Sequence, residues 1–161
     1  MPTNRFDDFE DDVVGVPNEA ILYRRVDWDR VGGRDRCPQG ASPKLNGNCF
    51  TDYALEKAVE LGYPGPCMSV GVSTVLGARN CGPERMLERF PGNGLAEVRA
   101  GDLRTLKRPD GAPCPQGIML AATDDEPWHG VVFDLAVGLK SAATKNAIAR
   151  LATWTIPLVN L

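Results

Sequence analysis

The sequence contains a single histidine, His129, and this scarcity limits the metal chemistry available to the chain. Zinc sites in proteins are built from closely spaced cysteine and histidine ligands. The five cysteines form no CxxC pair, and the glycines form neither a GxGxxG nor a P-loop pattern. The sequence therefore predicts no metal site and no nucleotide cofactor, and it predicts free thiols in a reducing compartment.

Long apolar runs and charge of one sign are also missing. No run approaches the roughly 18 apolar residues that span a bilayer, and the N-terminus lacks the apolar segment of a signal peptide. The net charge is −3, and the five arginines between Arg24 and Arg36 are interleaved with three aspartates rather than forming a basic stripe. We expect a cytoplasmic protein that binds neither membranes nor nucleic acid.

A length of 161 residues is typical of one domain. Residues 1–19 are acidic and poor in large apolar side chains, which predicts a mobile tail. Such a tail is either a solubilising leader or a docking strip for a basic partner. Residues 20–161 are predicted to form the single folded domain.

Two apolar runs, 118–122 and 131–137, flank the turn-forming segment 123–127. Aspartate and proline favour turns, and short runs rich in Val, Ile and Phe favour strands. The pattern predicts a hairpin at the centre of a sheet.

The rest of the chain alternates between further strand and helix signals. Apolar strand-like segments lie at 20–26, 67–72 and 95–99, and helical segments at 53–62, 83–90, 102–107 and 141–152. Thr51 or Asp52 is expected to cap the first helix and Ser141 the last. The inward-facing residues of these two helices are expected to be Leu55, Ala58, Val59, Ala147, Ile148 and Leu151. The predicted fold class is α+β, with a small, mostly antiparallel sheet and about three packed helices.

Cys49 and His129 are candidate catalytic residues. Cys49 lies just before the helix predicted to follow it, where the helix dipole favours a thiolate, and His129 opens a strand. This layout resembles papain-like cysteine peptidases of the NlpC/P60 and CHAP kind, and it implies that Cys49 is the nucleophile and His129 the base. The chain departs from those families because Phe50 follows Cys49 directly and no third polar group orients the histidine.

Arg24 suggests a different enzyme. An arginine on the first strand, followed by a strand carrying Ser69, resembles ADP-ribosyltransferase-like and RES-type NAD-consuming folds. The resemblance implies that Arg24 holds the phosphates of the cofactor. Glu97 is the only candidate for the acidic residue of such a site.

Four short motifs resemble a group of small bacterial proteins that has no established activity. They are Leu22-Tyr23-Arg24-Arg25, Phe50, Met68-Ser69-Val70 and Pro127-Trp128-His129. The resemblance groups Tyr23, Arg24, Ser69 and His129, which would either bind a ligand or form a buried polar network. Trp128 and Trp28 would mark a binding patch if they were exposed.

From the sequence we expect a bacterial binding or accessory protein that acts through a protein partner without catalysis of its own. The alternatives are a cysteine hydrolase using Cys49 and His129, and an NAD-consuming enzyme using Arg24. The sequence predicts no oligomeric state.

Overall fold

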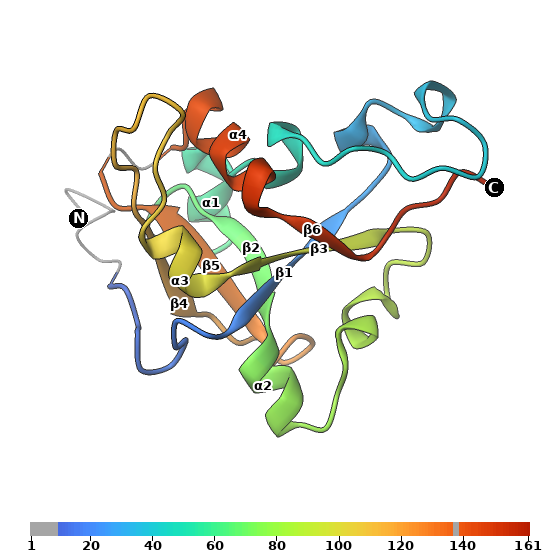
Figure 1. Ribbon diagram of the computed structural model, residues 1–161. Coiled ribbons are helices and arrows are strands. Elements are labelled where there is room, and N and C mark those ends of the chain that lie inside the picture. The colour runs from blue at the N-terminus through green and yellow to red at the C-terminus, as the bar shows by residue number, and fades with distance from the viewer. Residues whose placement is uncertain (1–9, 137–138) are drawn as a thin grey trace.

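A computed structural model describes residues 10–136 and 139–161 (Figure 1). Six strands form one sheet in which every neighbouring pair is antiparallel, in the order β4-β5-β2-β1-β3-β6. The strands are β1 (Ile21–Val26), β2 (Met68–Val72), β3 (Gly94–Arg99), β4 (Gln116–Leu120), β5 (His129–Asp134) and β6 (Thr153–Ile156). The predicted α+β class is confirmed.

The predicted hairpin is present but lies at one side of the sheet. β4 pairs with β5, with Ile118 opposite Val132, while β1 and β2 occupy the middle. The outer edge of β4 is covered by the chain before β1: the Asp12 amide donates to the Ile118 carbonyl, and the Asp11 carboxylate accepts from the Ile118 amide. This cover protects an edge strand that would otherwise expose unpaired backbone groups.

In the part of the chain that the structure describes, four α-helices and four short 3₁₀ turns connect the strands. They are α1 (Leu55–Glu60), α2 (Ser73–Ala78), α3 (Ala100–Arg104) and α4 (Ala142–Leu151), with turns at Asp29–Val31, Arg34–Arg36, Gly47–Phe50 and Pro83–Leu87. The helix α4 begins as predicted, because the Ser141 hydroxyl accepts a hydrogen bond from the Thr144 amide at 3.2 Å. The segment 83–90, predicted to be a helix, forms only the 3₁₀ turn.

The main core lies between one face of the sheet and the layer formed by α3, α4 and the turn Gly47–Phe50 (Figure 1). Alternate residues of β5 show the two faces. Val132 belongs to the main core, whereas Val131 and Phe133 belong to a smaller cluster on the opposite face. A third cluster contains Met86, Leu95 and Trp128.

The expected apolar stripe of α1 is only partly buried. Ala58 is fully buried, but Leu55 and Val59 are 48% and 40% exposed. The helix has six residues and begins after Ala54 without a side-chain cap, so only one of its positions faces the core. Leu151, expected to face inward from α4, is 43% exposed.

Residues 10–19 contact the domain, while residues 1–9 of the predicted tail lie outside the described residues. Val16 is fully buried, and the Arg104 guanidinium forms an ion pair with Asp11 at 2.9 Å. Within the described ranges, no helix has the length and apolar character needed to cross a membrane.

Candidate functional site

A cavity of about 200 Å³ lies beside the middle strands of the sheet. Three of its eleven lining residues are arginines. The residues that line it are Arg24, Arg25, Asp27, Arg30, Tyr53, Ser69, Val70, Met86, Phe90, Asn93 and Glu126. They come from β1 and the segment after it, from β2, and from three connecting loops.

The cavity lies where β1 and β2 part. These strands pair at only two positions, Leu22 with Val72 and Tyr23 with Gly71, although β1 pairs with β3 along its whole length. Beyond Tyr23 the Arg24 side chain takes the place of strand pairing, because its Nη1 donates to the Ser69 carbonyl at 2.9 Å.

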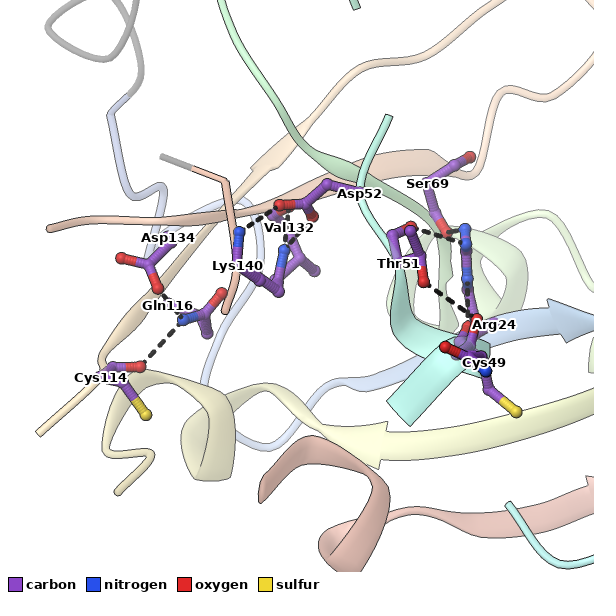
Figure 2. A network of polar contacts seen from close by, with 11 residues as sticks. Arg24, Cys49, Thr51, Asp52, Ser69, Cys114, Gln116, Val132, Asp134 and Lys140 are labelled. Atoms are coloured by element: carbon purple, nitrogen blue, oxygen red, sulfur yellow. Dashed lines mark hydrogen bonds and ion pairs between the residues drawn. The ribbon is translucent and has the colours of Figure 1, made fainter. Parts of the chain in front are cut away.

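The same guanidinium also reaches the segment before α1. Arg24 Nε donates to the Cys49 carbonyl at 3.0 Å, and Nη2 donates to the Thr51 carbonyl at 3.1 Å (Figure 2). One side chain therefore holds β1, β2 and residues 49–51 together.

Arg24 is 7% exposed, and its three hydrogen-bond partners are neutral carbonyls. Burial, and then the neighbouring charge of Arg30, lower the pKa of Arg24 to about 10. A guanidinium with this pKa stays charged at neutral pH. The result is a buried positive charge that forms no ion pair with a carboxylate of residues 10–136 or 139–161.

Arg25 and Arg30 add two more positive charges to the cavity. The Arg25 guanidinium lies 3.4 Å above the centre of the Phe90 ring, which orients it by a cation–π contact. Arg30 Nη1 donates to the Asn48 carbonyl at 3.1 Å. None of the ion pairs found in residues 10–136 and 139–161 includes Arg25 or Arg30. The acidic groups of the cavity are Asp27 and Glu126.

Ser69, which lines the cavity, forms a hydrogen-bonded pair with His129. His129 Nδ1 lies 2.9 Å from the Ala121 carbonyl, which can only accept, so Nδ1 carries a proton. In the neutral ring Nε2 then has a free lone pair, and the Ser69 hydroxyl, 2.5 Å away, donates to it. The Tyr63 hydroxyl lies 3.5 Å from Nδ1. The fold thus fixes the tautomer that lets His129 accept a proton from Ser69.

The structure does not bring Cys49 to His129. The Cys49 thiol is fully buried, and its Sγ donates to Asn46 Oδ1 at 3.9 Å. Burial raises the pKa of the thiol. Both ring nitrogens of His129 bond to other groups, and Figure 2 shows the Cys49 sulfur pointing away from the Arg24 guanidinium. These contacts do not favour Cys49 as a nucleophile.

A prediction about the thiols follows. Cys81 is partly exposed, whereas the other four free cysteines are buried, and burial raises the pKa of Cys67 to about 12. In the folded protein at pH 7.5, iodoacetamide is expected to modify Cys81 about tenfold faster or more than Cys49. Site-by-site mass spectrometry measures this ratio. Rapid modification of Cys49 that His129→Asn abolishes would instead support the cysteine hydrolase.

Tyr23 and Trp128 lie away from the cavity lining. Tyr23 packs with the cluster of Leu95 and Met86, and burial, followed by the charge of Glu97, raises its pKa. Trp128 is 7% exposed in the same cluster. Of the four residues grouped from the motifs, Arg24 contacts the Ser69 carbonyl and His129 contacts the Ser69 hydroxyl, whereas Tyr23 packs in another cluster.

The sequence interpretation missed several residues of the cavity. They are Arg25, Arg30, Tyr53, Phe90 and Glu126. The only signal was the run of arginines and aspartates after β1, which is too mixed in charge to indicate a site by itself. Among the described residues, no three His, Cys, Asp or Glu side chains gather closely enough to hold a metal ion.

A buried ion pair lies near the cavity. Lys140 Nζ bonds to the Asp52 carboxylate and, at 3.4 Å, to the Val132 carbonyl, and neither side chain of the pair is exposed (Figure 2). The Lys140 amide also donates to Asp52 at 3.0 Å. Burial lowers the pKa of Lys140, and the Asp52 charge opposes this. Asp52, expected to cap α1, instead anchors the segment before α4.

No family model matches the chain, and neither a curated protein nor a solved structure matches it. The function is therefore inferred from the chemistry of the cavity.

Proposed function

We propose that this protein binds a small anionic ligand, carrying a phosphate or carboxylate group, in the arginine-lined cavity. The observation that supports this most directly is that Arg24, Arg25 and Arg30 line one cavity of about 200 Å³. Three cations against the two acids Asp27 and Glu126 leave an excess positive charge, which attracts an anion.

The remaining donors and walls of the cavity suit such a ligand. A guanidinium has five N–H donors, and Arg24 uses three of them on carbonyls. The ring of Phe90 holds the Arg25 guanidinium in place, so less side-chain freedom is lost when an anion binds. Tyr53, Val70 and Met86 provide apolar surface beside these donors.

This proposal changes the partner that the sequence suggested. A binding role was expected, and the cavity supports a small ligand rather than a protein partner. A bacterial, cytoplasmic origin, a protein partner and an NAD-consuming activity stay predictions of the sequence. Glu97, the candidate acidic residue for the NAD-consuming activity, accepts a hydrogen bond from Thr155 on β6 and does not line the cavity.

Isothermal titration calorimetry with inorganic pyrophosphate at low salt tests the proposal. We expect saturable binding that weakens about tenfold or more in Arg25→Gln, because a charge-assisted hydrogen bond is lost. Arg85→Gln is the matched control, since Arg85 forms an exposed pair with Glu88 outside the cavity. Equal affinities of the two variants, or no saturable binding, would contradict the proposal.

A further inference from the structure

The Ser69–His129 pair has the arrangement of an activated nucleophile. A weak nucleophile becomes reactive when a base lies within hydrogen-bond reach and a third group orients that base. Here Ser69 Oγ lies 2.5 Å from His129 Nε2, and the Ala121 carbonyl holds Nδ1–H at 2.9 Å. Ser69 is partly exposed and lines the cavity, while His129 is 6% exposed behind it.

A positive charge contacts the backbone of this serine. Arg24 Nη1 donates to the carbonyl of Ser69 itself, and Arg24 lines the same cavity as Ser69. Fixed positive charge placed where an oxyanion develops stabilises the transition state more strongly than mobile water does.

From this geometry we infer that Ser69 is a catalytic nucleophile with His129 as its general base, acting on carboxylic esters that carry an anionic group. The inference rests on the proposed function for the anionic part of the substrate, whose charge Arg25 and Arg30 would bind.

The reaction balances with water as the only co-reactant. Ser69 Oγ bonds to the ester carbonyl carbon while its proton moves to His129 Nε2. The bond from that carbon to the alkoxide oxygen then breaks, and the alkoxide takes the proton from Nε2 and leaves as an alcohol. Water next adds to the acyl group on Ser69 and gives a proton to Nε2. The Ser69 oxygen leaves the carbon, takes that proton back, and the carboxylic acid is released.

Labelling with a fluorophosphonate probe, mapped by mass spectrometry, is the first test. We expect the probe to modify Ser69 and not Ser42, Ser73 or Ser141. His129→Asn is expected to reduce the labelling rate at least a hundredfold, because Asn keeps an N–H for the Ala121 carbonyl but supplies no base. Ser73→Ala is the control, since Ser73 also lies near β2 and its hydroxyl accepts from the Ile21 amide.

Hydrolysis of two esters tests the substrate class. The wild type is expected to cleave mono-4-nitrophenyl glutarate at least tenfold faster than neutral 4-nitrophenyl butyrate, and Arg25→Gln is expected to remove that preference. Ser69→Ala is expected to abolish cleavage of both esters, and circular dichroism shows whether each variant is folded. If Ser69→Ala does not fold, the same loss is expected in His129→Asn.

The two proposals fail in different ways. Pyrophosphate binding without labelling of Ser69 would overturn the nucleophile and leave the anion site standing. Labelling of Ser69 without pyrophosphate binding, and with equal cleavage of both esters, would overturn the anionic substrate class and the proposed function together.

Discussion

Replacing Arg24 with methionine is expected to lower the free energy of unfolding by about 4 kcal/mol. The substitution leaves the carbonyls of Cys49, Thr51 and Ser69 without the donor that now reaches all three. A buried acceptor that loses its partner costs roughly 1–3 kcal/mol. The methionine variant no longer has to remove a charged guanidinium from water on folding, and this gain offsets part of the loss. Urea denaturation, followed by circular dichroism, measures the change.

Arg24→Lys separates charge from geometry. Lysine keeps the positive charge, but its ammonium group is a compact point and does not reproduce the planar fork of arginine. We expect a loss of at least about 2 kcal/mol, since one ammonium group cannot reach three carbonyls on separate segments. Arg85→Met, at an exposed pair with Glu88, is expected to change stability by less than about 0.5 kcal/mol. Wild-type stability of Arg24→Lys would show that the three hydrogen bonds contribute little.

Lys140→Met is expected to destabilise the protein by about 3–5 kcal/mol. Asp52 and Lys140 have no exposed side-chain area, so the substitution leaves a carboxylate buried without its cation. Charges removed from water in this way are costly unless they are paired. Denaturation with urea at pH 7 gives the difference from the wild type.

The double variant Asp52→Asn/Lys140→Met distinguishes the pair from simple packing. Asparagine keeps an oxygen for the Lys140 backbone amide, which now donates to Asp52 at 3.0 Å, and no lone charge remains. We expect the double variant to be more stable than Lys140→Met alone by at least about 1 kcal/mol. Additive losses in the two single variants would mean that the charges do not interact across the pair.

Strong local patterns made much of the fold predictable. The apolar runs of β1, β2, β3 and the β4–β5 hairpin are short and bounded by turn residues, and Ser141 caps α4 as such residues do. The helix α2 was missed because STVLGA contains β-branched residues and glycine, which are weak helix formers. The strand β6 was missed because TWTI is only four residues long, and it is defined by pairing with β3 rather than by its own pattern.

The site was harder to predict because it depends on register. The motifs grouped Arg24, Ser69 and His129, and Ser69 contacts both of the others, Arg24 through its carbonyl and His129 through its hydroxyl. Ser69 and His129 meet because β2 pairs with β5, with Ser69 opposite Val131 and Gly71 opposite His129, and sequence patterns do not specify such long-range registers. Arg25 and Arg30 come from one stretch of chain, but their convergence with Phe90 depends on how a distant loop folds back. The burial of Cys49 is likewise a property of the packed core.

The order of the strands also has consequences for the speed of folding. Apart from the β4–β5 hairpin, the ladders join distant parts of the chain: Tyr23 pairs with Glu97, Ser69 with Val131, and Leu95 with Ile156. Large loops must close before such contacts gain any free energy, so two-state domains of this kind fold on the order of milliseconds to seconds. We expect the β4–β5 hairpin to form early in folding and the short pairing between β1 and β2 to form late. Loss of Arg24, which links these two strands, is then expected to accelerate unfolding more than it slows folding.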